Sequence, residues 1–177
     1  AGLRSHLPAN VKVEFSAGSH LAGAKITPGH LNAGDSKQEG LLGEYFDNPN
    51  LKGKPVLKRV DDAIDFFWDN NQSPDHSMTK TSEYSVRWTG VLRPKVTGEY
   101  TLNTLSDDGI RLFIDGKPII NNWANHGAAE DTKKIRLVKG QAYKIRLEYY
   151  QGWGSAVVRF GWTPPARMRV RTYPHRP

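Results

Sequence analysis

Alternation of apolar and polar residues runs through most of this chain, and it constrains the possible folds more than any other feature. In one run Ile110, Leu112 and Ile114 fall on the same side of an extended backbone. Similar runs, rich in β-branched and aromatic residues, occupy residues 41–47, 84–92, 98–105, 109–115, 117–123, 132–138, 142–150 and 155–162. No sustained helical period accompanies them. The sequence therefore predicts an all-β fold, an antiparallel β-sandwich or barrel.

The alternation places this sandwich in residues 40–163, and a chain of 177 residues with 37% hydrophobic content suits one domain. Residues 1–39 are predicted to be a flanking segment and linker. Their start indicates a helix that leads into one strand, and the polar, turn-rich stretch 22–39 is typical of a linker. Residues 164–177 are interpreted as a basic tail.

The net charge of +7 is concentrated outside the predicted sandwich. Residues 164–177 hold four arginines and no acidic residue, whereas residues 40–163 carry a net charge of only +2. A basic surface interleaved with aromatics, which nucleic-acid binding requires, is missing from this middle part. No run approaches the roughly 18 apolar residues of a membrane-spanning helix. We therefore expect neither nucleic acid nor a membrane as partner.

Two adjacent aspartates, Asp107 and Asp108, precede Gly109 where the alternation predicts a turn between strands. One carboxylate is enough for such a turn, because it bonds the nearby backbone while the glycine takes a positive φ angle. The second carboxylate adds like-charge repulsion. We therefore expect another group to compensate for the pair.

Tryptophans provide further candidate residues. Trp153 lies between two glycines in a predicted loop, where an exposed ring could stack on the apolar face of a sugar, so ligand contact is favoured over core packing. Trp88 and Trp162 fall within strand alternation and are predicted core residues. Trp68, before a polar loop, fits either role.

The run "NNWANH", residues 121–126, follows a predicted strand. Asn122, Trp123 and His126 could form a polar wall beside the aspartates or only lock the turn, and the sequence favours neither.

Catalytic motifs are absent from the sequence. It contains no nucleophilic serine elbow, no His-Glu-x-x-His helix and no phosphate-binding loop. Its six histidines have no metal-ligand spacing. This chain alone is not predicted to be an enzyme.

Several motifs, in order and spacing, resemble the PA-fourteen domain family, named after the N-terminal part of anthrax protective antigen. They are "GLLGEYFDNPNL", "YSVRWTGVLRPKVTGEYTLNTLSDDGIRLFIDGKPIINNW" and "LEYYQGWGSAVVRFGW". The N-terminal "GLRSHLPANVKVEFSAGSHLAG" is similar to the segment that precedes such a module in family three glycoside hydrolases, mostly β-glucosidases. This second resemblance implies that residues 1–39 come from a neighbouring glycosidase domain.

The flocculin branch of the family implies a role for the aspartates. There, two consecutive aspartates joined by a cis peptide bond hold a calcium ion that coordinates sugar hydroxyls, and Asp107 and Asp108 match that motif. The alternative is that one aspartate only caps the turn or bonds backbone amides. Flocculins add an asparagine from a later loop, where this chain has Gln151, which carries the same amide one methylene further out.

The resemblance thus implies a carbohydrate-binding module, an accessory insert that holds or fences the sugar of a β-glucosidase-like enzyme. Its expected partners are a gluco-oligosaccharide and the catalytic domains of the parent, since the glycosidase nucleophile would lie in a separate barrel domain. Localisation is left open, with a secreted or periplasmic one favoured. The alternative function is a structural or protein-interaction insert that binds no sugar.

Overall fold

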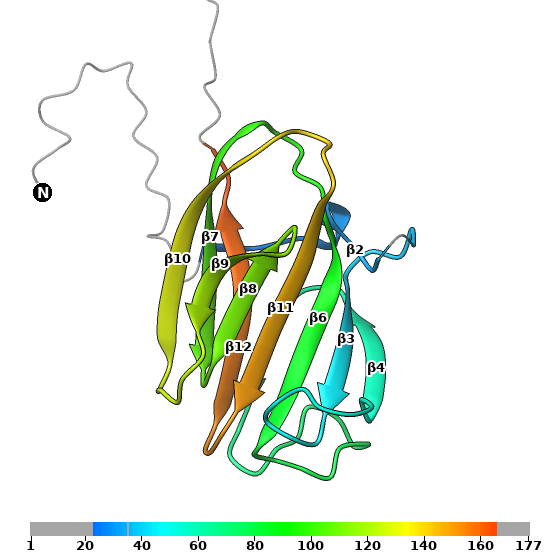
Figure 1. Ribbon diagram of the computed structural model, residues 1–177, viewed down its shortest axis with the longest axis vertical. Helices are drawn as coiled ribbons and strands as arrows, with labels where there is room; N and C mark the ends of the chain where they lie inside the picture. The colour runs from blue at the N-terminus through cyan, green and yellow to red at the C-terminus, as the bar shows by residue number, and fades with distance from the viewer. Residues whose placement is uncertain (1–22, 35, 166–177) are drawn as a thin grey trace, which may run out of the picture.

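The structure, a computed structural model, describes residues 23–34 and 36–165, and they form two antiparallel sheets packed face to face (Figure 1). This confirms the predicted all-β sandwich. The smaller sheet has the order β1 (Ala24–Lys25), β12 (Ala156–Thr163), β7 (Gly98–Asp107) and β10 (Ala129–Leu137), and β5 (Asp65–Trp68) also pairs with β12. The larger sheet has the order β4 (Leu57–Asp61), β3 (Leu41–Phe46), β6 (Tyr84–Leu92), β11 (Tyr143–Gln151), β8 (Ile110–Ile114) and β9 (Lys117–Asn122), and β2 (Leu31–Asn32) also pairs with β6.

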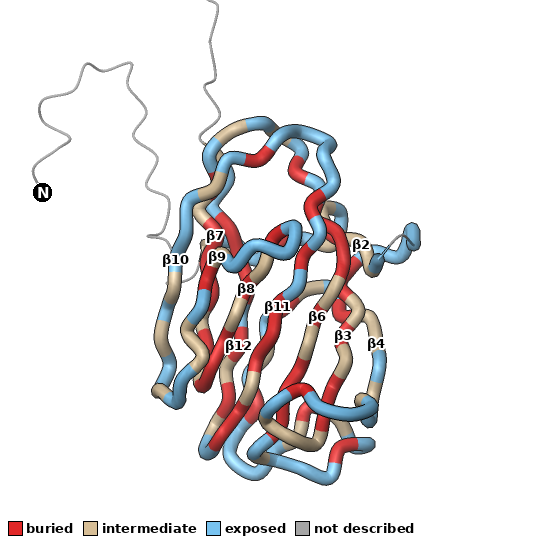
Figure 2. The backbone as a smooth tube through the Cα atoms, viewed as in Figure 1, coloured by how far each residue is buried: buried red, intermediate tan, exposed pale blue. Residues whose placement is uncertain are grey.

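The core lies between the sheets and follows the alternation of the sequence. Buried residues alternate with exposed ones along the first half of β11 and with partly buried ones along β8 (Figure 2). Large aromatic side chains fill much of this core, because they bury the most apolar area per residue. Trp88 and Trp162 are 0% and 4% exposed, which confirms their predicted place in the core.

The stretch predicted as a linker is instead partly built into the sandwich. Ala24–Lys25 pairs with β12, Leu31–Asn32 pairs with β6, and a 3₁₀ turn (Pro28–His30) lies between these two short strands. Ile26 and Leu31 are each only 1% exposed. The interpretation of residues 22–39 as a linker is therefore wrong for residues 24–32, where two isolated apolar residues gave too weak a pattern to reveal strands. The predictions for residues 1–22 and for the basic tail from residue 166 lie outside the described residues.

The antiparallel connections divide the loops between two ends of the sandwich. We call one the aspartate end, formed by residues 107–109, 123–128 and 152–155. We call the other the pocket end, which contains residues 28–30, 93–97 and 164–165. Within the described residues, no helix is both long and apolar enough to cross a membrane.

Candidate functional site

The turn between β7 and β8 contains both aspartates. A cis peptide bond joins Asp107 to Asp108, as the resemblance implied. The next residue, Gly109, lies against the ring of Tyr150, so closely that a side chain at this position would overlap the ring. Local packing therefore explains why a glycine follows the pair.

Asp108 fastens two other loops to this turn. Its side chain is buried, and its Oδ1 accepts a hydrogen bond from the backbone N–H of His126 at 2.9 Å. Its Oδ2 accepts one from the backbone N–H of Gly152 at 2.8 Å. Asp108 thus bonds backbone amides, which was one of the two roles considered for an aspartate of this motif. The carboxylate still has lone pairs for a further partner.

Asp107 has a different environment. Its side chain is partly buried, and no Lys or Arg of residues 23–34 and 36–165 forms an ion pair with either aspartate. Burial raises the pKa of Asp107, and the neighbouring Asp108 raises it further, while His126 and the backbone N–H of Ala128 act in the opposite direction. The site therefore concentrates two carboxylates that form no ion pair with a Lys or Arg of the described chain.

The oxygen donors of this turn are compatible with calcium, which prefers hard oxygen ligands. In the described part of the chain, no third Asp, Glu or His joins the two aspartates in a metal-binding group. Calcium takes 6–8 oxygen ligands. A bound ion would therefore need further oxygens from backbone, amide, water or ligand groups.

Gln151 holds the loop that carries the exposed tryptophan. It is fully buried, and its Nε2 donates to the carbonyl oxygens of Trp153 at 2.8 Å and Gly154 at 3.2 Å. Its Oε1 contacts the hydroxyl of Tyr149 at 2.9 Å. Gln151 therefore positions the loop, and its amide oxygen already has a partner in this structure.

Trp153 is 69% exposed, the highest value among the large hydrophobic residues of the described chain. The glycines on both sides have separate physical reasons. A side chain at Gly152 would approach Asp108 Oδ2 to 3.0 Å, and Gly154 has a positive φ of 84°. The loop thus presents an indole ring to solvent directly after the residue that Asp108 binds.

Two roles were considered for the run 121–126, a polar wall beside the aspartates and locking of the turn, and different residues of the run fit each of them. His126 borders the aspartates through its backbone, whereas Asn122 donates to Asp131 at 3.0 Å. Trp123 lies between two side chains, with the Arg111 guanidinium 3.9 Å from its ring centroid and the Tyr150 ring 4.7 Å away. Asn122 and Trp123 therefore lock the loop, and of these three residues His126 is the one that bonds the aspartate turn.

Trp68 does not belong to this surface. It is 8% exposed and stacks on Phe66 in the core at a centroid distance of 5.0 Å, so of the two roles that it fitted, ligand contact is wrong and core packing is observed. Its position after two phenylalanines gave no signal of direction, because alternation in so short a strand cannot fix which residues face inward.

Sequence reasoning missed Asn125 and Tyr150. The Tyr150 hydroxyl donates to Asn125 Oδ1 at 2.7 Å, and Asn125 is exposed. A Cβ at Gly152 would lie 3.8 Å from Asn125 Nδ2, so this amide lies near Asp108. Burial, and then Asp108, raise the pKa of Tyr150. The signal available was that Tyr150 alternates with the core-facing Tyr149 and must therefore point outward.

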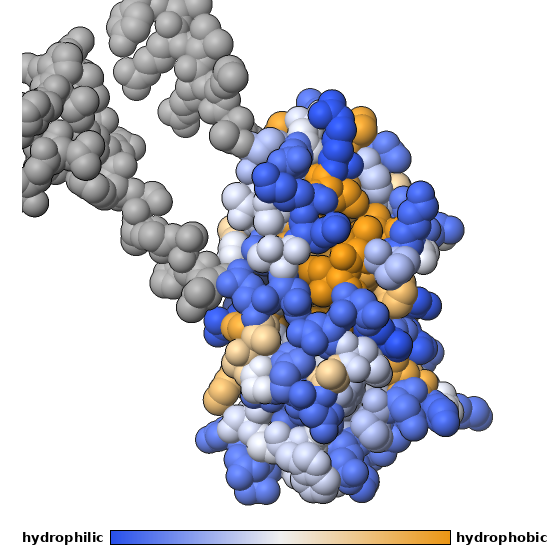
Figure 3. Space-filling view, turned by 60° about the vertical axis from the view of Figure 1, so that its left-hand side comes forward, coloured by the Kyte–Doolittle hydropathy of each residue, from blue (hydrophilic) through white to orange (hydrophobic). Residues whose placement is uncertain are grey.

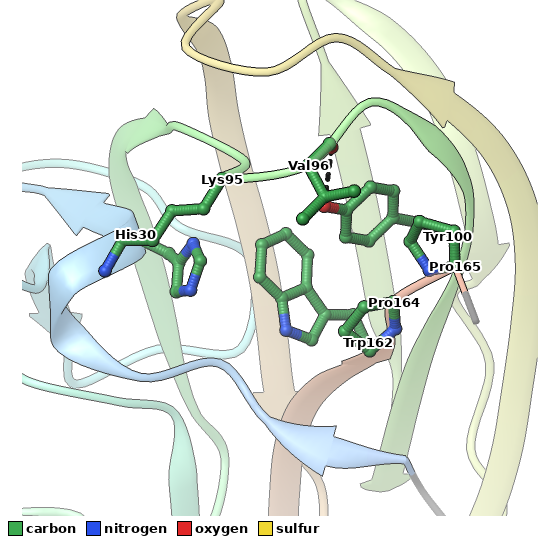
Figure 4. A pocket seen from close by; sticks show the side chains of 7 residues that line it. All are labelled: His30, Lys95, Val96, Tyr100, Trp162, Pro164 and Pro165. Carbon is green, nitrogen blue, oxygen red and sulfur yellow. Dashed lines mark hydrogen bonds between the residues drawn. The ribbon is translucent and has the colours of Figure 1, made fainter. Parts of the chain in front are cut away.

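The pocket end contains a cavity of about 390 Å³ (Figure 4). Its lining residues are His30, Lys95, Val96, Tyr100, Trp162, Pro164 and Pro165. The Tyr100 hydroxyl donates to the Val96 carbonyl at 2.8 Å, and the His30 ring lies 4.8 Å from that of Trp162. The cavity is aromatic, and none of the described residues that line it carries a carboxylate.

Comparison with known proteins shows which family and which relatives this chain resembles. The family model described as "PA14 domain" matches residues 37–172. The anti-sigma-I factor RsgI3 of Acetivibrio thermocellus is 38% identical over 130 residues, which are 73% of this chain and 20% of that protein. A β-glucosidase of Rhizobium radiobacter is 24% identical over 137 residues, 69% of this chain and 16% of the enzyme. The match thus spans a fifth or less of these relatives.

Solved structures agree with the fold. An anti-sigma factor domain-containing protein from Clostridium clariflavum superposes with a TM-score of 0.67 at 44% identity, covering 72% of this chain and 42% of that one. The A domain of epithelial adhesin 6 from Candida glabrata, crystallised with Galβ1-3GlcNAc, superposes with a TM-score of 0.55 at 13% identity, covering 85% and 88%. At that identity the second likeness shows the fold alone.

Proposed function

This chain belongs to the PA14 domain family, and we propose that it is a non-catalytic carbohydrate-binding module that holds a sugar at its aspartate end. The exposed ring of Trp153 carries this proposal. An indole ring 69% exposed, in the loop whose Gly152 N–H bonds Asp108, offers an aromatic surface near carboxylates and amides, the two kinds of surface that a sugar needs. The ring suits the apolar face of a pyranose, and the polar groups suit its hydroxyls.

In this proposal Asp107 and Asp108 hold a calcium ion. The ion would neutralise the carboxylate pair and offer open coordination positions to sugar hydroxyls. Asn125 and Tyr150 would border the ligand with an amide and a phenol. Asp108 would serve both roles at once, since its two loop contacts fix the turn that presents the carboxylates.

The parent protein is a separate question. A β-glucosidase-like parent is supported by the β-glucosidase relative, at 24% identity, while anti-sigma factors are more similar to this chain. We therefore propose the sugar-holding role for the module itself. Our proposal for the larger protein is a glycoside hydrolase, with an anti-sigma factor as the competing parent.

A second candidate function, a protein-interaction insert, is favoured by one observation. Figure 3 shows hydrophobic residues gathered on the side of the molecule that carries β9 and β10. Ile119 of β9 and Ile135 of β10 are only partly buried. A contiguous exposed apolar surface of this kind is typical of contacts with another protein or domain.

Titration calorimetry with gluco-oligosaccharides of different linkages, in calcium and in chelator, tests the proposal. We expect binding that Trp153→Ala weakens by about tenfold, equivalent to about 1.4 kcal/mol. Val138→Ala, which truncates another exposed hydrophobic residue (43% exposed), is the matched control and should leave binding unchanged. If no gluco-oligosaccharide binds the unmutated domain in either condition, the interaction-insert function replaces this one.

A further inference from the structure

Phe67 is the second strongly exposed aromatic of the described chain, with 64% of its surface accessible. It lies on the outer face of the smaller sheet, because its neighbours Phe66 and Trp68 face the core. A phenylalanine in a strand is normally placed to bury its ring. At this position the ring offers an aromatic surface on which a ligand can stack.

Strand register connects Phe67 to the aspartate end. Phe67 is paired with Val157 of β12, and Val157 is paired with Asp107 of β7. The three residues form one row across the sheet. Residues paired directly across neighbouring strands point to the same face, so the side chains of Val157 and Asp107 share the outer face with Phe67. Two strand spacings of about 4.8 Å separate Phe67 from Asp107, roughly 10 Å in all.

The next row on the outer face, two residues further along each strand, supplies polar groups beside the ring. It consists of Asp65, Arg159 and Leu105 in register. Arg159 Nε bonds Asp65 Oδ1 at 2.9 Å, and Lys25 Nζ lies 3.7 Å from Asp65 Oδ2. Arg159 and Lys25 remain more than half exposed. An aromatic plane flanked by exposed charged donors suits a sugar ring better than a purely apolar partner.

We propose that the ligand is an oligosaccharide chain rather than a single terminal sugar, and that Phe67 is a second stacking position for it. One unit is held at the aspartate end, and the following units cross Val157 and stack on Phe67. This inference rests on the proposed function, because the chain is anchored at the aspartates. The continuity of the row from Asp107 to Phe67 carries it.

Calorimetric titration with glucose, di- and hexasaccharides of each glucan linkage, in calcium, tests the inference. For the linkage that binds, we expect the unmutated domain to bind the hexasaccharide at least tenfold more tightly than the disaccharide. Phe67→Ala should remove this advantage and change the disaccharide Kd less than twofold. Phe67→Tyr should retain it, and Val138→Ala is the control for loss of an exposed apolar side chain.

The outcomes distinguish failure of the extended site from failure of the proposed function. If Phe67→Ala leaves the hexasaccharide affinity unchanged, or weakens both lengths equally, the extended site is wrong while recognition at the aspartate end stands. If no probe binds the unmutated domain, the proposed function fails and the inference fails with it. Thermal unfolding of each variant confirms that it is folded, as expected for a change at an exposed side chain.

Discussion

The two ends of the sandwich differ in how far their aromatic and polar side chains are already paired within the protein. The pocket end has a cavity of about 390 Å³, yet its aromatic rings pack on one another and its tyrosine hydroxyl bonds a backbone carbonyl. The aspartate end instead concentrates two carboxylates and exposes an indole ring. Its cavity alone would make the pocket end a candidate site. We favour the aspartate end in our proposal, because its paired carboxylates and exposed indole ring offer both polar and aromatic contacts to a ligand.

The largest effect should come from Asp108, which supports the loops of one end. Asp108→Ala leaves the partly buried N–H of His126 and the buried N–H of Gly152 without an acceptor, so we expect a loss of about 2–4 kcal/mol in the free energy of unfolding. Lys95→Ala at the pocket end, an exposed residue, should change it by less than about 0.5 kcal/mol. Denaturant titration measures both changes in the free energy of unfolding. Equal effects of the two substitutions would contradict a special structural role for Asp108.

Calcium should stabilise the aspartate end through native-state binding. At a hundredfold excess over Kd the free energy of unfolding should rise by about 2.7 kcal/mol, visible as an increase in the melting temperature. Asp107→Asn should abolish this rise, whereas Asp65→Asn, an exposed aspartate of the same sheet, should preserve it. A melting temperature independent of calcium would contradict calcium binding by the paired aspartates.

The smallest effect should be a pH dependence in chelator. Because folding raises the pKa of Asp107, its ionisation disfavours the folded state. Stability should therefore fall as pH rises from the unfolded-state pKa of about 3.9 through the raised value, and remain lower at pH 7. Asp107→Asn should recover about 0.2–1 kcal/mol at pH 7 in chelator. A pH profile identical to that of the unmutated domain would show that ionisation of Asp107 does not destabilise the folded domain.

The sequence predicted much of the fold because alternation reports burial directly. Strands such as Ile110–Ile114 and Tyr143–Gln151 lie where the pattern placed them. Strands β1 and β2 were missed because two residues are too few for a period. They are held by pairing with β12 and β6, which sequence alone does not show.

Prediction of the candidate site was less complete because it depends on contacts between loops distant in sequence. The paired aspartates and Trp153 stood out as residues with a local oddity, a doubled charge and a ring between glycines. Asn125 carries no such mark, and its place near Asp108 comes from contacts with Gly152 and Tyr150. The direction of Trp68 was equally hidden, since packing of the two sheets decides it.

Nuclear magnetic resonance can test directly which end binds sugar. The isotope-labelled domain would be titrated with the best-binding gluco-oligosaccharide in calcium, following backbone amide shifts. We predict that the largest shifts fall on residues 107–109, 123–128 and 152–155, with little change at His30, Lys95 and Val96. Shifts concentrated at those pocket-end residues, with the aspartate end unchanged, would contradict the assignment of sugar recognition to the aspartates and Trp153.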